Sequence, residues 1–213
     1  MSLVLHGFRY SVYVRIVRMV LAEKRLAYTH RELNPFAADV PADYLELHPF
    51  KRVPTLVHGD FVLYETTAIT RYLDEAFPGP ALQPLAPQAR ARMAQIIAII
   101  DSYGYWPMVR QVFSQRVFAP AMGNMPDEAM IVDGITKSYR VLAALEALAN
   151  HDGPLMGGPN WSLADLHLAP MMAYFTAAPE GAAALSTHPK LTAWWAVMAA
   201  TSSLRDTAPG LPG

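Results

Sequence analysis

The stretch His48-Pro49-Phe50-Lys51-Arg52-Val53-Pro54-Thr55-Leu56 decides how the first third of this chain is expected to fold. A proline between a loop and a strand, as at Val53-Pro54, is often cis, and such a bond is rarely accidental. It would turn the main chain of Val53 outward, so that its N–H and C=O could pair with an extended peptide as an added strand does. The alternative is that Pro54 only shapes a turn.

A second stretch, Leu63-Tyr64-Glu65-Thr66-Thr67-Ala68-Ile69, follows at the point where a strand ends and a helix begins. Thr66 can offer its hydroxyl and its N–H to a carboxylate at the positive end of that helix. Glu65 can pair with an ammonium group. Together they suit the α-amino acid end of a peptide ligand. In the alternative interpretation, Thr66 is an N-cap and Glu65 only complements the helix dipole.

Working outward, hydrophobic spacing and turn signals predict the order βαβαββα for residues 1–78. A parallel βαβ unit should be followed by an antiparallel hairpin and a closing helix, which gives a mixed sheet. The expected elements are a strand at 3–6, a helix from Ser11, a strand at 26–33, a short helix from Pro41 to His48, a hairpin of 55–57 and 61–63, and a helix at 66–77.

The rest of the chain is expected to be helical. Prolines at 78, 80, 84 and 87 predict a linker over 79–87, and the apolar spacing from Gln88 onward is typical of helices. Ser162-Leu163-Ala164-Asp165 has the form of a capping box with an acid in the fourth place. The sequence therefore predicts an α/β domain over 1–78 and an all-helical domain over 88–213.

Composition excludes several functions. The formal net charge of −1 argues against nucleic acid as the main partner, because phosphate binding needs a basic face. We expect no membrane span and no signal peptide, and therefore a cytoplasmic protein. Cysteine is absent, so any sulfur chemistry must use a sulfur supplied by a ligand. The seven histidines lack the spacing of a zinc motif, and no metal is expected.

Three segments resemble the cytosolic glutathione S-transferase superfamily, in particular its bacterial, serine-type members. Ser11-Val12-Tyr13-Val14-Arg15-Ile16-Val17-Arg18 is similar to the "S-x-x-V-R-x-V-R" start of that family's first helix. Residues 48–56 are similar to its "N-P-F-G-K-V-P-x-L" loop, and residues 63–69 to its "L-x-E-S-x-A-I" segment. The resemblance covers nearly the whole chain. It implies a thioredoxin-like N-terminal domain, an all-helical C-terminal domain, a homodimer, and glutathione as co-substrate without a metal.

Ser11 is the catalytic residue that this resemblance implies. A thiol with a pKa near 8.5 is only a few per cent thiolate at pH 7. A hydroxyl that donates to the sulfur at a helix N-terminus stabilises the anion without itself being deprotonated. Two alternatives stay open: Ser11 only caps the first helix, or the neighbouring Tyr10 or Tyr13 donates instead.

The glutathione-binding residues implied by the resemblance are Arg52, Val53, Pro54, Glu65 and Thr66. Arg52 stands where relatives have Lys or Gln for the glycyl carboxylate, and a guanidinium can bind a carboxylate through two N–H groups. Lys51 replaces the usual glycine; it shares this contact or is simply solvated. No His or Lys aligns near Asp39-Val40, where relatives often carry one for the same carboxylate.

The resemblance implies an electrophile site between Phe8-Arg9-Tyr10 and the first helices of the second domain. Its candidate lining residues are Phe8, Tyr10, Tyr13, Tyr103, Trp106 and Arg110. An aromatic wall would favour hydrophobic electrophiles. In the alternative interpretation, aromatic residues at helical spacing belong to the core.

The expected function is conjugation of glutathione to a hydrophobic electrophile. Glutathione-dependent isomerisation, dehalogenation or ether cleavage would need the same binding residues. A second hypothesis is a binding or regulatory protein of the same fold without turnover. A glutaredoxin-like thiol reductase is disfavoured because the chain has no cysteine.

Overall fold

The computed structural model describes residues 2–150, 154–155 and 160–212. The chain divides into two compact units. The first contains the residues up to Ala81 together with Asp206–Pro209, and the second contains Leu82–Arg205. The boundary at Ala81 falls inside the 79–87 segment in which the sequence predicts a linker.

The first unit is built on a four-stranded mixed sheet, as the sequence predicts. Its strands are β1 (Leu3–Gly7), β2 (Tyr28–Glu32), β3 (Thr55–His58) and β4 (Phe61–Tyr64), in the order β2-β1-β3-β4. β1 is parallel to β2 and antiparallel to β3, and β3 is antiparallel to β4. The predicted hairpin is confirmed, with Gly59 at φ +62° between the paired residues His58 and Phe61.

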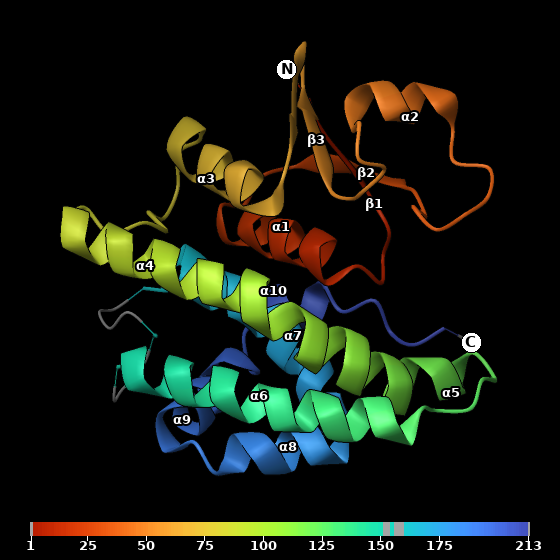
Figure 1. Ribbon diagram of the computed structural model, residues 1–213. Coiled ribbons are helices and arrows are strands. Elements are labelled where there is room, and N and C mark those ends of the chain that lie inside the picture. Colours follow the sequence, from red (N-terminus) through yellow and green to blue (C-terminus); the bar gives the residue numbers. More distant parts are fainter. Residues whose placement is uncertain (1, 151–153, 156–159, 213) are drawn as a thin grey trace. The chain divides into compact units, whose positions relative to one another are not determined.

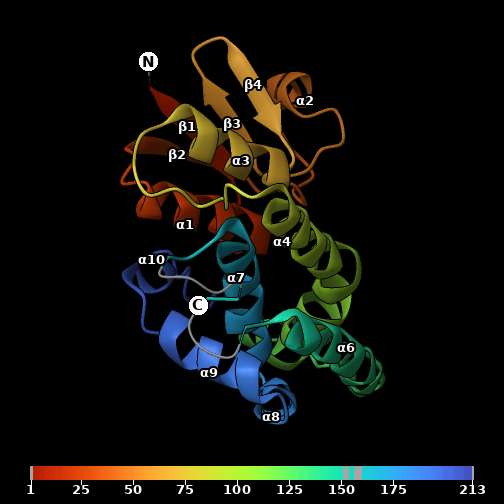
Figure 2. The same ribbon diagram turned by 90° about the vertical axis from the view of Figure 1, so that its left-hand side faces the viewer.

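Three helices complete this part of the chain. They are α1 (Val12–Glu23), α2 (Ala42–Leu47) and α3 (Thr66–Ala76). α1 and α3 pack side by side on one face of the sheet, and α2 lies away from that face (Figures 1 and 2). The apolar side of α1 supplies much of the core, including Val14, Ile16 and Val17, which are fully buried. The predicted order βαβαββα is confirmed.

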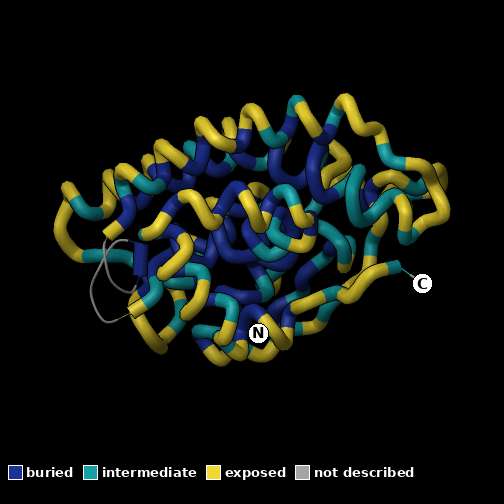
Figure 3. The backbone as a smooth tube through the Cα atoms, turned by 90° about the horizontal axis from the view of Figure 1, so that it is seen from below, coloured by how far each residue is buried: buried dark blue, intermediate teal, exposed yellow. Residues whose placement is uncertain are grey.

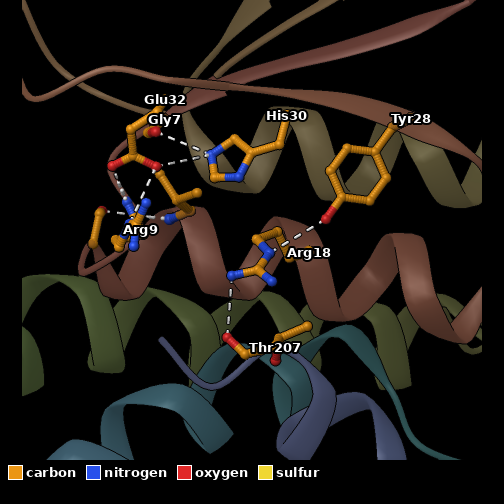
Figure 4. Close-up of polar contacts among 9 residues, drawn as sticks. Gly7, Arg9, Arg18, Tyr28, His30, Glu32 and Thr207 are labelled. Atoms are coloured by element: carbon orange, nitrogen blue, oxygen red, sulfur yellow. Dashed lines mark hydrogen bonds and ion pairs between the residues drawn. The ribbon is translucent and has the colours of Figure 1, made fainter. Parts of the chain in front are cut away.

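The chain returns to the first unit near its C-terminal end. The Arg18 guanidinium donates from Nη1 to the C=O of Thr207 at 3.2 Å and from Nε to the hydroxyl of Tyr28 at 3.3 Å. Figure 4 shows Arg18 between these two partners. One side chain on α1 thus ties β2 to a segment that lies 189 residues beyond Arg18 in the chain.

The second unit is helical. α7 contacts α4, η1, α8 and α9, and its side chains are buried along most of its length. Buried stretches of the tube in Figure 3 alternate with exposed outer turns, as expected of helices around a common core. The helices are α4 (Pro87–Ile99), η1 (Ile100–Phe118), α5 (Ala119–Ala121), α6 (Glu128–Leu148), α7 (Leu163–Ala177), α8 (Pro179–Ser186), α9 (Pro189–Met198) and α10 (Ser202–Asp206).

Two local features of the second unit bear on the sequence analysis. η1 continues α4 as a π-helix; at its C-terminal end the N–H of Ala119 bonds to the C=O of Ser114, five residues earlier. Pro107 lies inside this helix and is buried. The predicted capping box at Ser162 is confirmed, with the Ser162 N–H donating to Asp165 Oδ2 at 2.7 Å.

Candidate functional site

The loop before β3 has the cis peptide bond at Val53-Pro54 that the sequence predicts. Among the residues that the structure describes, none forms a hydrogen bond with the N–H or the C=O of Val53. Pro54 and Thr55 behind it are buried. The loop therefore leaves one peptide unit able to pair with an extended ligand, as the sequence analysis expects.

A buried tyrosine from α2 holds this loop in place. The hydroxyl of Tyr44 donates to the C=O of Arg52 at 2.6 Å, so the Thr55 hydroxyl, at 2.9 Å, must donate to Tyr44. Burial raises the pKa of Tyr44 above its usual value, and the hydrogen bond with Thr55 opposes this shift only in part. Tyr44 is a positioning residue that the sequence analysis missed, because only the fold brings it to the loop.

Lys51 and Arg52 are both exposed, and the backbone at position 51 has a conformation that favours glycine. Lys51 has φ +50°, in the left-handed region that costs an L-residue about 1 kcal/mol or more. Its ammonium group and the Arg52 guanidinium are therefore presented to solvent from the same turn. Both remain candidates for contact with a carboxylate.

Glu65 and Thr66 begin α3, but the alternative interpretation assigns the N-cap to the wrong residue. Glu65, not Thr66, is the N-cap residue, and its side chain makes no capping hydrogen bond. Its φ of +71° is a strained value for a glutamate, and such values cluster at functional sites. The first intrahelical bond runs from the Ile69 N–H to the Glu65 C=O at 3.0 Å. The N–H groups of Thr66, Thr67 and Ala68 are therefore available to an anion.

Ser11 is the N-cap residue of α1. Its Oγ accepts a long hydrogen bond from the Val14 N–H at 3.4 Å, and its own N–H donates to the Phe8 C=O at 2.8 Å. In the described part of the chain no acceptor takes the Ser11 hydroxyl proton. Capping therefore uses a lone pair and leaves the donor free, so the capping role and the thiol-binding role are compatible.

The expected electrophile-site residues fall into two groups. Phe8 and Tyr10 lie between β1 and α1 with their rings edge to face and 5.3 Å between centroids, and Tyr13 is in the first turn of α1. The other three belong to η1 in the second unit: Tyr103, Trp106 and Arg110. The Tyr103 and Trp106 side chains are 67% and 55% exposed, so the alternative that they form the core is wrong.

A buried histidine at the start of the loop that carries Val53-Pro54 was also missed. His48 is 2% exposed, and its ring lies 4.7 Å from that of Tyr64, the residue before Glu65. Burial lowers the pKa of His48 below its usual value, and the nearby Glu65 opposes this shift only in part. Its Nδ1 has no hydrogen-bond partner among the described residues. Its place before Pro49 is the only feature of the sequence that marks His48, and this does not indicate that the ring is buried.

Two absences among the described residues concern metals and membranes. No group of three or more histidine, aspartate or glutamate residues in this part of the chain could hold a metal ion. No helix in the described ranges has the length and apolar character needed to cross a bilayer.

Comparison with known proteins gives the family. The family models described as "Glutathione S-transferase, N-terminal domain" and "Glutathione S-transferase, C-terminal domain" match residues 5–81 and 105–201. Glutathione S-transferase 3 of Zea mays is 30% identical over 98% of this chain and 94% of its own length. A stringent starvation protein A homolog of Haemophilus influenzae is 37% identical over 76% of this chain and 69% of its own length.

A solved structure agrees with this assignment. The apo form of glutathione S-transferase III superposes with a TM-score of 0.85 and 28% identity, over 100% of this chain and 98% of the other. Its match spans both compact units. The chain therefore belongs to the glutathione S-transferase family.

Proposed function

We propose that this protein binds glutathione on its first unit, activates the thiol with Ser11, and transfers the sulfur to a hydrophobic electrophile. Ser11 would then make it a serine-type transferase. The relatives named above include a plant and a bacterial protein, so the bacterial subtype stays a prediction.

The observation that carries the proposal is the free hydroxyl proton of Ser11 at the N-terminus of α1. Because Oγ only accepts in its bond with the Val14 N–H, its proton is not used by the cap and can be donated to a sulfur. The positive end of α1 adds a favourable field for a thiolate. The thiol of bound glutathione loses its proton to water, and the Ser11 hydroxyl hydrogen-bonds the sulfur anion. The anion attacks the electrophilic carbon; the leaving group departs with the electron pair of its bond, or, where the carbon belongs to a double bond, the neighbouring atom takes a proton from water.

Four further contacts would hold the peptide. The Val53 N–H and C=O pair with its backbone, the amides that begin α3 bind its γ-glutamyl carboxylate, and Glu65 binds the ammonium group. Arg52, exposed on the turn before Pro54, takes the glycyl carboxylate. Each group has an unused donor or acceptor in the structure, which supports assigning all of them to one ligand.

The test is a titration of the bound thiol in two variants of Ser11. Ser11→Ala should raise the pKa of bound glutathione by about one unit or more and lower turnover near pH 7 about tenfold. Ser11→Gly keeps more of the cap, losing only a few tenths of a kcal/mol where alanine loses about 0.5–2. If the hydroxyl acts on sulfur, both variants shift the thiol pKa alike. If Ser11 is only a cap, both keep the wild-type pKa and differ in stability alone.

The electrophile is proposed to be hydrophobic because its candidate contacts are aromatic: Phe8, Tyr10 and Tyr13 from the first unit, and Tyr103 and Trp106, with Arg110, from the second. Isomerisation, dehalogenation and ether cleavage use the same activated sulfur. A panel of electrophiles assayed with the wild-type protein distinguishes these reactions by their products.

A second candidate is a glutathione-binding or regulatory protein without turnover. It is favoured by the likeness to proteins named stringent starvation protein A homolog, whose name is not that of a transferase. Retention on immobilised glutathione with no turnover of any electrophile would support this candidate and contradict the first.

We also propose a cytoplasmic homodimer that binds no nucleic acid. Phe50, 67% exposed on the loop before Pro54, is the candidate residue for insertion into a partner subunit. Exposure of a large apolar side chain beside the proposed ligand site supports an interface there. Sedimentation should give a dimer at micromolar concentration and a weaker one for Phe50→Ala; a wild-type monomer would contradict the proposal.

A further inference from the structure

The turn that carries Ser11 is anchored by the C-terminal end of a neighbouring strand. This turn runs from Phe8 to Ser11 and is closed by the bond from the Ser11 N–H to the Phe8 C=O at 2.8 Å. β2, which ends at Glu32, lies beside it because β1 and β2 are parallel and pair Gly7 with Glu32. Figure 4 shows the side chains of His30 and Glu32 converging on Gly7 and Arg9.

The start of the turn is fixed at Gly7. Its C=O accepts from the Leu33 N–H at 3.0 Å and from His30 Nε2 at 3.0 Å, so His30 carries its proton on Nε2. A Cβ at Gly7 would lie 2.5 and 2.7 Å from the two methyl carbons of Val14. The strand end is therefore pressed against the first turn of α1, and any side chain here would displace that turn.

The middle of the turn is fixed by Glu32. Its Oε1 accepts from the Arg9 N–H at 3.0 Å, and its Oε2 lies 3.7 Å from Arg9 Nε and 3.9 Å from His30 Nε2. The ion pair with the Arg9 side chain is exposed, 43% on the glutamate side, and contributes little. The bond to the Arg9 N–H is different, because it is charge-assisted and restrains the peptide itself.

We infer that Glu32 is a positioning residue for Ser11: its carboxylate holds the Arg9 peptide, and thereby sets where the Ser11 hydroxyl lies relative to the bound sulfur. This inference rests on the proposed function of Ser11. A hydroxyl that must donate to one atom is sensitive to displacement, and errors near 1 Å in an active site can lower the rate about a hundredfold. The role inferred for Glu32 is exerted through the Arg9 peptide and requires no contact with the ligand.

The experiment compares Glu32→Ala with Glu32→Gln, with Ser11→Ala, and with the Ser11→Ala/Glu32→Ala double variant. Glutamine keeps an oxygen that can accept the Arg9 N–H, whereas alanine removes it. Glu75→Ala is the matched control, because it deletes an exposed carboxylate of the same unit that pairs with Arg71 at 2.7 Å. The readouts are kcat, KM for glutathione, the pKa of the bound thiol, and hydrogen exchange at the Arg9 amide.

We expect Glu32→Ala to lower kcat about five- to tenfold at pH 7, with KM for glutathione within about twofold. The thiol pKa should rise, and the Arg9 amide should exchange faster. Glu32→Gln should recover most of the activity, and Glu75→Ala should match the wild type. In the double variant the Glu32 substitution should add nothing to the loss from Ser11→Ala, because both act on one hydrogen bond.

Three results would overturn the inference, and the failure of the Glu32 role is distinguishable from the failure of the proposed function. If Ser11→Ala shifts the thiol pKa and Glu32→Ala does not, the proposed function stands and Glu32 is only a surface residue. Losses that add fully in the double variant lead to the same conclusion. If Ser11→Ala itself leaves the thiol pKa unchanged, the proposed function fails, and the role of Glu32 fails with it.

Discussion

Asp165 offers the sharpest test of how the second unit is held together. Its carboxylate is fully buried and accepts four hydrogen bonds. Oδ1 accepts from the Leu155 N–H at 2.7 Å and from Trp194 Nε1 at 2.9 Å. Oδ2 accepts from the Ser162 N–H at 2.7 Å and from its hydroxyl at 2.6 Å. One side chain thus joins the start of α7 to α9 and to the segment before α7.

The Asp165→Ala substitution would leave three buried N–H donors without an acceptor. Each costs about 1–3 kcal/mol when unsatisfied. The loss is offset in part, because burial raises the pKa of Asp165 and the variant no longer buries a carboxylate. We expect a net loss of about 3–5 kcal/mol in the free energy of unfolding, a large share of the 5–15 kcal/mol typical of native proteins.

Urea unfolding followed by tryptophan fluorescence measures this loss. The matched control is Asp127→Ala, which removes the N-cap carboxylate of α6; that carboxylate accepts one bond, from the Met130 N–H at 3.0 Å, on an exposed turn. The control should lose only about 1 kcal/mol. If Asp165→Ala loses no more than Asp127→Ala, the four bonds do not stabilise the fold as argued, and the reasoning is refuted.

Two further predictions concern the first unit. Glu65→Ala and Thr66→Ala should each weaken glutathione binding by about 1–3 kcal/mol, the value of a lost charge-assisted hydrogen bond, whereas Thr67→Ala should not; unchanged calorimetric affinity in both variants would remove the proposed γ-glutamyl site. Because burial lowers the pKa of His48, the unfolded chain takes up the proton first, so the free energy of unfolding should fall as the pH drops below about 6.5. His48→Phe, which keeps a ring in place, should show a shallower fall in urea unfolding between pH 7.5 and 5.5; an identical fall would assign the effect to other groups.

Much of the fold could be predicted because its signals are local. The cis Val53-Pro54 bond, the hairpin at Gly59 and the capping box at Ser162 each depend on a few adjacent residues. Strand ends were less certain: β2 begins at Tyr28 and not at Leu26, because pairing with β1, not composition, decides where it starts.

The missed features depend on how the folded chain packs and not on a pattern of adjacent residues. Tyr44 reaches Arg52 and Thr55 only once α2 has docked, and Arg18 reaches Thr207 across 189 residues. The π-helical winding of η1 is likewise a property of packing, since it differs from an α-helix only in the carbonyl that each N–H selects. No residue pattern in the sequence predicts which groups will form these hydrogen bonds.

The groups proposed to bind the ligand lie at one end of α1 and α3, and the groups that hold these two helices together lie at the other end. Ser11 and Thr66 stand at the N-termini of α1 and α3, and the opposite ends of these helices are joined by a buried ion pair. Lys24 Nζ lies 3.2 Å from Asp74 Oδ1 with side chains 2% and 6% exposed, and it also donates to the C=O groups of Asp74 and Pro80. A buried ion pair adds little net stability but tolerates few alternative arrangements. Because it fixes α1 against α3, the pair also fixes the spacing between a hydroxyl proposed to bind sulfur and amides proposed to bind a γ-glutamyl carboxylate. That spacing has to match the ligand. Without the pair, the N-termini of α1 and α3 would be held less precisely relative to each other, and this explains why the cost of burying Lys24 is tolerated.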